Sequence, residues 1–357
     1  MRELFIFTTF MVLFQAQVNS LSEFMANQTQ LYDDLFKNYN PDIGCVNTIA
    51  PKSPYILNIE SGMFKLVKIV EAEESVTFLF DLILTWHDER LEWHPDDYGG
   101  INHIYVPLKN VWVPELTIVD STDQKSFLEK DMLYAWIYNN GSVSFYHSSI
   151  VTTICEMDVF RFPMDKHTCS INVIYHSYEP GEFEILAEQG LMPRPIRTLG
   201  NGEWQMESMG VRKQIMNDNK TLLNLYEATF HRNPSFYITL IIIPAYFINA
   251  LSIVALFHNL EARGEKYQIG MTNIMSMSFI MVILADDLPK TKNIPLLAIF
   301  VIVCLALMLA ALACALIIPK VTPFLIKYNR TLPRKISLIL MYLLQIANFI
   351  NFIVLFI

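Results

Sequence analysis

Charged side chains are scarce in this chain: they make up 17% of its 357 residues, against about 25% in a typical soluble protein. Hydrophobic residues reach 53%, which excludes a disordered chain because such chains combine low hydrophobicity with high net charge. The net charge is −9, and no stripe of basic residues is present to follow a phosphate backbone, so a nucleic-acid partner is not expected. The apolar excess instead indicates a membrane protein.

Motifs for metal binding and catalysis are also missing. The five cysteines form no C-x-x-C pair, and no H-E-x-x-H sequence occurs, so we expect no zinc or other metal site. The chain has no G-x-S-x-G elbow, no phosphate-binding P-loop and no recognisable pair of catalytic carboxylates. We therefore expect neither a cofactor nor an enzymatic activity.

The charges that are present divide the chain in two. Residues 21–232 hold 30 acidic and 16 basic side chains, whereas residues 233–357 hold 4 and 9. An acidic domain rich in Trp and Tyr thus precedes an apolar one, with the boundary near Asn233.

Residues 1–20 are typical of a signal peptide. Arg2 precedes an apolar core over residues 4–14, which is too short to span a bilayer of about 30 Å. A buried N-terminal helix is the alternative interpretation. Export would place residues 21–232 outside the cell, where disulfides and N-glycans form. Three sequons of the N-x-S/T type then become candidate glycosylation sites, at Asn27, Asn140 and Asn219.

Four hydrophobic runs follow the acidic domain and are long enough to cross a membrane as helices. They cover residues 235–257, 267–285, 294–318 and 336–357. The connector 319–335 holds five basic residues and no acidic one, which by the positive-inside bias makes it a short cytoplasmic loop. The chain is therefore expected to be a multi-pass plasma-membrane protein with an extracellular N-terminal domain.

The extracellular part is predicted to be a β-sandwich with an N-terminal helix. After a helical segment at residues 21–36, β-branched and aromatic residues cluster in runs separated by Gly, Pro, Asn and Asp. The clearest runs are 76–86, 143–146, 171–175 and 223–230. The predicted fold class is thus a sandwich followed by a four-helix transmembrane bundle.

Three cysteines lie in the exported domain. Cys155 and Cys169 enclose thirteen residues, and a disulfide closing so short a loop contributes about 3 kcal/mol in the chain-entropy model. Pairing of Cys45 with either of them is the alternative.

The enclosed segment reads Cys155-Glu-Met-Asp158-Val-Phe-Arg-Phe162-Pro163-Met-Asp165-Lys-His-Thr-Cys169. It resembles the signature loop of Cys-loop pentameric ligand-gated ion channels, the nicotinic acetylcholine receptor family. Further similarity runs through Trp86-His-Asp-Glu-Arg-Leu-Glu-Trp93, Trp112-Val-Pro-Glu115, Arg232-Asn-Pro-Ser-Phe236 and Gly264-Glu-Lys266. The resemblance covers roughly residues 21–357 and implies a pentamer of identical or related subunits, gated by a small-molecule transmitter.

The second hydrophobic run carries a polar stripe. Steps of three and four residues from Glu265 reach Gln268, Thr272, Met275, Phe279, Val282 and Asp286, which share one helical face. Repeated around a symmetry axis, the stripe predicts a pore with carboxylates at both mouths and a hydrophobic constriction between them. Packing of this face against neighbouring helices is the alternative. The acidic rings favour cations, and residues 261–264 lack the Pro-Ala-Arg run of anion-selective relatives.

The ligand region departs from the nicotinic pattern. Asp81, Val119 and His176 stand where that family has aromatic rings, and the adjacent Cys-Cys pair is missing. Tyr175 and Tyr178 remain near the second ligand loop. The resemblance therefore implies either a different transmitter or an accessory subunit that binds none. A membrane-anchored receptor or adhesion protein that conducts no ions is the rival from another class, and the polar stripe argues against it.

The resemblance also implies a coupling region between the two domains. Arg232 is expected to pair with an acidic residue of the turn that holds Glu71, Glu73 and Glu74. Phe162 and Pro163 are expected to press on Leu288 and Pro289, which follow the pore helix.

Overall fold

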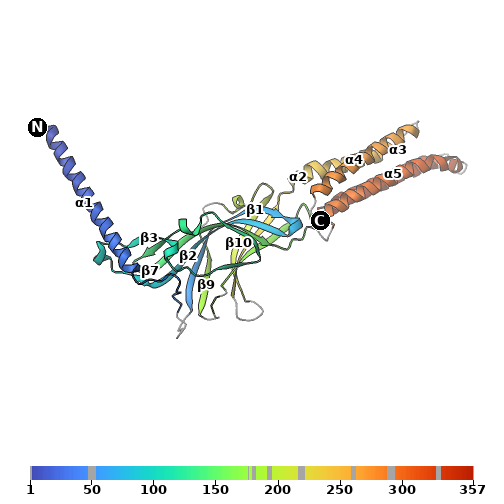
Figure 1. The fold of residues 1–357 in the computed structure, drawn as a ribbon. Coiled ribbons are helices and arrows are strands. Elements are labelled where there is room, and N and C mark those ends of the chain that lie inside the picture. Colours follow the sequence, from blue (N-terminus) through green and yellow to red (C-terminus); the bar gives the residue numbers. More distant parts are fainter. Residues whose placement is uncertain are drawn as a thin grey trace.

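A computed structural model describes residues 2–46, 54–175, 177–178, 182–190, 195–215, 222–258, 263–287, 294–326 and 331–356. A long helix lies at one end, a body of β-strands in the middle, and a bundle of helices at the other end (Figure 1). The predicted fold class is confirmed: an N-terminal helix and a β-sandwich precede four apolar helices.

The N-terminal helix α1 runs continuously over Arg2–Phe36. Its C-terminal part is held on the sandwich by Leu31, which is fully buried, and by Tyr32, whose hydroxyl accepts a hydrogen bond of 2.9 Å from the Asn110 side chain. The predicted signal peptide covers the part of α1 that precedes these contacts, and its removal stays a prediction.

Two sheets form the sandwich. The larger has the order β3-β6-β7-β2-β1-β9 with β5 paired to β7, and the smaller has the order β10-β11-β8-β4. The strands of the larger sheet are β1 Tyr55–Val70, β2 Ser75–Glu92, β3 His103–Pro107, β5 Ser121–Ser126, β6 Tyr134–Tyr138, β7 Asn140–Ile154 and β9 Phe183–Gln189. Those of the smaller sheet are β4 Thr117–Val119, β8 Lys166–Ile174, β10 Trp204–Ile215 and β11 Leu222–Arg232.

Alternating side chains fill the space between the sheets. In β2, Phe78 and Phe80 point inward and are fully buried, because successive side chains of a strand lie on opposite faces. Phe78 stacks on Phe64 of β1 at 4.4 Å and on Phe230 of β11 at 5.8 Å. The aromatic runs noted in the sequence therefore form one core that joins both sheets.

Within the described residues, four helical segments are long and apolar enough to cross a membrane. The first combines α2 Ser235–Tyr237, a π-helical turn over Ile238–Ile242, and α3 Ile243–Phe257. The others are α4 Arg263–Asp287, α5 Leu296–Ile326 and α6 Leu332–Val354.

Helix α5 continues past the predicted end at residue 318. It includes Pro319 and Pro323 and reaches Ile326. Each proline removes only one backbone donor, and transmembrane helices tolerate proline where neighbouring groups satisfy the freed carbonyl. A proline is therefore a weaker end signal here than in a soluble helix.

Candidate functional site

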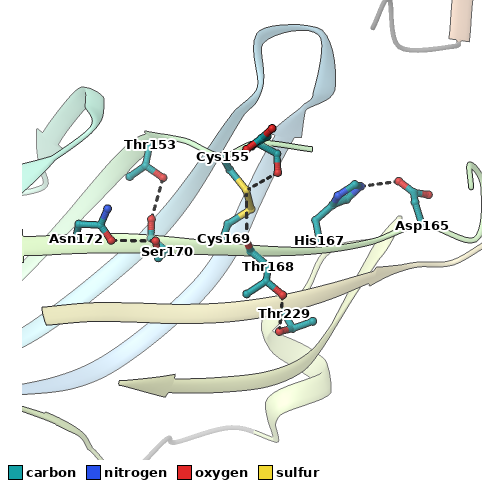
Figure 2. The surroundings of a disulfide bond; sticks show 10 residues. Thr153, Cys155, Asp165, His167, Thr168, Cys169, Ser170, Asn172 and Thr229 are labelled. Atoms are coloured by element: carbon teal, nitrogen blue, oxygen red, sulfur yellow. Dashed lines mark hydrogen bonds and ion pairs between the residues drawn. A yellow bond between two sulfur atoms is a disulfide. The ribbon is translucent and has the colours of Figure 1, made fainter. Parts of the chain in front are cut away.

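The Cys155–Cys169 pair is disulfide-bonded, as the sequence predicted. Cys45 is free, and its sulfur lies 3.1 Å from the Tyr55 hydroxyl, so the alternative pairings of Cys45 are wrong. Figure 2 shows the bridge beside β8, with His167 and Asp165 further along the same segment. The disulfide thereby ties the end of β7 to the strand that carries the charged groups described next.

Arg232, the last residue of β11, is the centre of a buried ionic cluster. Its side chain is 1% exposed, and its Nε donates to Asp165 Oδ1 at 2.8 Å. Nη2 donates to Glu71 Oε1 at 2.5 Å, and Nη1 donates to Glu203. The guanidinium carbon also lies 4.2 Å from the centre of the Trp204 ring and 4.6 Å from that of Phe162. One planar cation thus joins three acidic groups and two aromatic faces.

The charges of this cluster stabilise one another. Burial alone would raise the pKa of the Asp165 carboxyl, but hydrogen bonds from His167 and Arg232 and the nearby guanidinium charge hold that pKa below its usual range. Burial acts to lower the pKa of Arg232, and its hydrogen bonds to Asp165 and Glu71 outweigh that effect, so the pKa is raised. Both groups are therefore fully charged at neutral pH.

The structure places the predicted coupling residues as follows. Glu71 contacts Arg232. Glu73 lies in the same short helical turn, Glu71–Glu73, and Glu74 follows that turn in the left-handed conformation with a φ of 48°. Among the described residues, the carboxylates in contact with Arg232 also include Asp165 and Glu203. Sequence reasoning missed both as partners of Arg232, because the strand pairing that brings residues 165, 203 and 232 together is not local.

The loop between the two cysteines reaches the helical domain. Phe162 is 1% exposed and belongs to the buried apolar cluster that also holds residues of α4 and α5, and its ring meets that of Tyr237 edge-on at 4.7 Å. The Leu296 amide, at the start of α5, donates to the Phe160 carbonyl at 2.8 Å. Phe162 thus contacts both Arg232 and the helices. Leu288 and Pro289 lie outside the described residues.

Asp81 occupies a sheet position where the nicotinic pattern has a ring. It is 4% exposed and accepts a hydrogen bond of 2.5 Å from Ser148 Oγ. Burial and a hydrogen bond to Asp81 raise the pKa of the Tyr146 hydroxyl to about 12. Burial also lowers the pKa of His147, beside these residues on β7. Asp81 is therefore a buried member of a polar cluster with Ser148 and Tyr146.

The other ligand-region residues belong to different elements from Asp81. Val119 ends β4 and is half-buried. Tyr175 is 7% exposed and donates to the Phe183 carbonyl at 2.7 Å, and Tyr178 stacks on the Phe183 ring at 4.7 Å. His176 lies outside the described residues.

An aromatic cluster that the sequence did not predict surrounds these tyrosines. Phe183 stacks on Tyr55 at 5.8 Å, and Tyr55 meets Trp112 edge-on at 5.9 Å. The cluster exists because β1 and β9 pair in parallel, with Tyr55 opposite Phe183. Only that non-local pairing, and no local motif, could have identified Phe183 and Tyr55.

Helix α4 packs by one edge only. Gly270, Met277 and Leu284, at seven-residue intervals, are buried. The predicted pore residues on the opposite side are exposed in this chain: Glu265, Gln268, Thr272, Met275, Phe279 and Val282. Asp286 lies in the last turn of α4. The long apolar side chains Met275, Phe279 and Val282 are 58%, 60% and 62% exposed.

The sequons differ in setting. Asn140 is exposed at the start of β7, and Asn27 is half-buried on α1. Asn219 lies outside the described residues. Their modification stays a prediction.

Comparison with known proteins agrees with this arrangement. The neurotransmitter-gated ion-channel ligand binding domain matches residues 28–234, and the neurotransmitter-gated ion-channel transmembrane region matches residues 241–353. The chain belongs to the neurotransmitter-gated ion-channel family. This family consists of ligand-gated channels and not enzymes, and four membrane helices after an extracellular domain make the chain a multi-pass plasma-membrane protein.

Individual members of the neurotransmitter-gated ion-channel family are distant relatives. The proton-gated ion channel subunit pbo-6 of Caenorhabditis elegans is 25% identical over 249 residues, 68% of this chain and 58% of the relative. The human acetylcholine receptor subunit epsilon is 27% identical over 290 residues, which are 77% of this chain and 58% of the relative. The 5-hydroxytryptamine receptor 3A of Cavia porcellus is 24% identical over 303 residues, which are 82% of this chain and 60% of the relative. The matches thus span about six tenths of the length of these relatives.

Proposed function

We propose that this chain is a subunit of a pentameric, cation-selective channel in which a small-molecule transmitter, bound by the extracellular domain, opens a pore lined by α4. The observation that carries this proposal is the two-sided character of α4. One edge is packed through Gly270, Met277 and Leu284, and the opposite face leaves large apolar side chains exposed. A symmetric ring of five such faces accounts for these side chains, since they would constrict a central path.

Cation selectivity is inferred from the ends of the same face. Glu265 is exposed in the first turn of α4, where the positive end of the helix dipole favours a carboxylate. The neighbouring Lys266 is half-buried and lies off the exposed face. A ring of Glu265 carboxylates would set a negative potential at the cytoplasmic mouth and attract permeating cations.

Reversal potentials test this proposal. With the channel expressed in cells, replacing external Na⁺ by a large organic cation should shift the reversal potential to negative values, while replacing Cl⁻ should leave it unchanged. Glu265→Ala should reduce the shift, and Glu261→Ala, outside the predicted stripe, should not. A reversal potential that follows the chloride gradient would overturn the selectivity proposal.

Arg232 and Phe162 support a coupling role between the domains. Arg232 ends the last strand and is separated from the first membrane helix by two residues, and Phe162 bridges Arg232 and the helical bundle. A displacement of β11 or of the disulfide loop would therefore be transmitted to α4 and α5 through packed side chains rather than through a flexible linker.

A second candidate function is an accessory subunit that forms no transmitter site of its own. The buried, hydrogen-bonded Asp81 favours it, because Asp81 replaces one of the rings by which the nicotinic pattern binds an ammonium group through cation–π attraction. The chain expressed alone should then give no current with acetylcholine, 5-hydroxytryptamine or acid steps, the stimuli that its relatives' names suggest. A current with acetylcholine from the homomer would contradict both this candidate and the expectation of a different transmitter.

A further inference from the structure

A groove at the end of the sandwich distant from the membrane is not used by the proposed channel mechanism. It has a volume of about 540 Å³ and lies between α1, the end of β2, and the short turn Pro95–Tyr98. Its lining includes Asp34, Tyr39, Arg90, Trp93, Asp97 and Tyr98. Sites for small molecules typically have volumes of about 300–1,000 Å³, so the groove has the size of a binding site for a small organic molecule.

The free charge of the groove is negative. Among the described residues that line it, Arg90 is the only arginine or lysine, and its guanidinium is 2.7 Å from the fully buried Asp88 carboxylate and 4.5 Å from the Tyr39 ring. In the described part of the chain, no basic side chain forms an ion pair with Asp34 or Asp97. Asp34 accepts a hydrogen bond of 3.1 Å from the Tyr98 hydroxyl, which places a carboxylate beside an aromatic ring.

The chemistry of the lining selects an organic cation over a metal ion. No group of three or more His, Cys, Asp or Glu side chains able to hold a metal occurs in the part of the chain that the structure describes. The carboxylates are instead spread around a lining that also contains Trp93 and Tyr98. Separated carboxylates and aromatic rings suit a cation with an apolar body, because the rings cover the body while the carboxylates offset the charge.

The groove also adjoins the first ligand segment. Tyr39, which lines it, donates a hydrogen bond of 2.9 Å to Asp88 and accepts one of 3.0 Å from the Trp112 amide. Trp112 in turn meets the ring of Trp86 edge-on at 6.4 Å. A molecule in the groove therefore lies one side chain away from the segment that resembles the family's first ligand loop.

We propose that this groove is a second binding site, separate from the transmitter region, for a protonated amine with an aromatic or aliphatic body. Asp34 and Asp97 hold the ammonium group, and the partly exposed ring of Tyr98 covers the body. Because Arg90 is neutralised by Asp88, it does not repel the cation. The position beside Tyr39 and Trp112 makes the occupant a modulator of the transmitter region; that consequence rests on the proposed channel function, whereas the binding itself does not.

The test is equilibrium binding of 2-phenylethylammonium to the purified full chain in lipid nanodiscs, measured by isothermal titration calorimetry. The Asp34→Asn/Asp97→Asn variant should bind roughly tenfold more weakly, since it loses two of the three carboxylates that line the groove and keeps similar side-chain volumes; the third, Glu92, lies 3.4 Å from His87. Asp96→Asn is the matched control, because Asp96 lies on the same turn, is exposed, and does not line the groove. The neutral analogue 2-phenylethanol should bind at least roughly tenfold more weakly than the amine.

A second variant separates charge from space. Asn38→Trp fills the groove from an exposed position and leaves all carboxylates intact, so it should abolish binding without loss of folding, as checked by thermal unfolding. The proposal is overturned if the wild-type chain shows no saturable binding, if the Asp34→Asn/Asp97→Asn variant binds as tightly as Asp96→Asn, or if the alcohol binds as tightly as the amine. Each result is independent of the reversal potential, so failure of this site leaves the channel proposal untouched.

Discussion

At the scale of single residues, Arg232 is distinguished by the number of groups that contact its guanidinium. A lysine could supply the charge, but only the planar guanidinium can donate to Asp165, Glu71 and Glu203 at once and also stack against Trp204 and Phe162. A buried ion pair adds little net stability compared with an apolar replacement of the whole group. Removing one partner is different, because the remaining buried charges then have no counter-charge.

Arg232→Gln should therefore be strongly destabilising, by about 3–5 kcal/mol, since it leaves the nearly fully buried Asp165 without its cation. Arg232→Lys should recover part of the loss, because it restores charge without the bidentate geometry. The matched control is Arg212→Gln on the adjacent strand, whose side chain is 60% exposed and pairs with Glu227; its effect should stay below about 1 kcal/mol. Thermal unfolding of the detergent-solubilised protein measures all three. Equal losses for Arg232→Gln and Arg212→Gln would show that the cluster has no special structural role.

At the scale of secondary-structure elements, the sequence is a good guide wherever the signal is local. The runs 76–86 and 143–146 lie within β2 and β7 because alternating apolar side chains specify a strand directly. The stripe from Glu265 to Val282 lies on the exposed side of α4 because helical spacing specifies a face. The parallel pairing of β1 with β9 had no such signal, since it joins residues more than a hundred positions apart, and the Phe183 cluster was missed with it. The partners Asp165 and Glu203 of Arg232 were missed for the same reason.

The packed edge of α4 leads to a prediction about helix contact. A Cβ added at Gly270 would lie 2.6 Å from Leu312 Cδ1 of α5, so Gly270→Ala should displace the Leu312 side chain from its present position. We expect a loss of about 1–3 kcal/mol from overpacking, offset in part by the higher helix propensity of alanine. Leu312→Ala should cost less stability in the Gly270→Ala background than in the wild-type chain, because it also removes the clash; thermal unfolding of the single and double variants measures this difference.

Gly264→Ala is the control for that comparison. Gly264 lies in the first turn of α4, and nothing lies within 4 Å of the position that a Cβ would take there, so this change should not lower stability. If Gly270→Ala is as harmless as Gly264→Ala, or if Leu312→Ala costs the same in the wild-type chain and in the Gly270→Ala background, the close approach of α4 and α5 at Gly270 is not as described.

At the scale of the whole molecule, a continuous series of contacts joins the end of the sandwich to the pore helix. β11 ends at Arg232, Arg232 contacts Phe162, and Phe162 contacts Tyr237 at the start of the first membrane helix and shares a buried apolar cluster with residues of α4 and α5. Helix α4, whose buried edge belongs to this cluster, leaves its opposite face exposed in the single chain. In the proposed pentamer that face surrounds the ion path. A movement of the sandwich that shifts α4 would therefore change the width of the pore.

The accessibility of α4 to water tests this arrangement. Cysteine introduced at Met275 or Phe279 should react with a charged thiol reagent applied during activation, and the current should be blocked, because both side chains lie on the exposed face. Cysteine at Ser276 or Ile280, each one position further along and half-buried, should react much more slowly. Because Cys45 and Cys314 are free and could react themselves, the channel without an introduced cysteine serves as the control. If the reagent changes the current of that control, Cys45 and Cys314 should be replaced by serine before the new cysteines are tested. If positions 276 and 280 react and positions 275 and 279 do not, α4 must be rotated about its axis, and the proposed pore face is wrong.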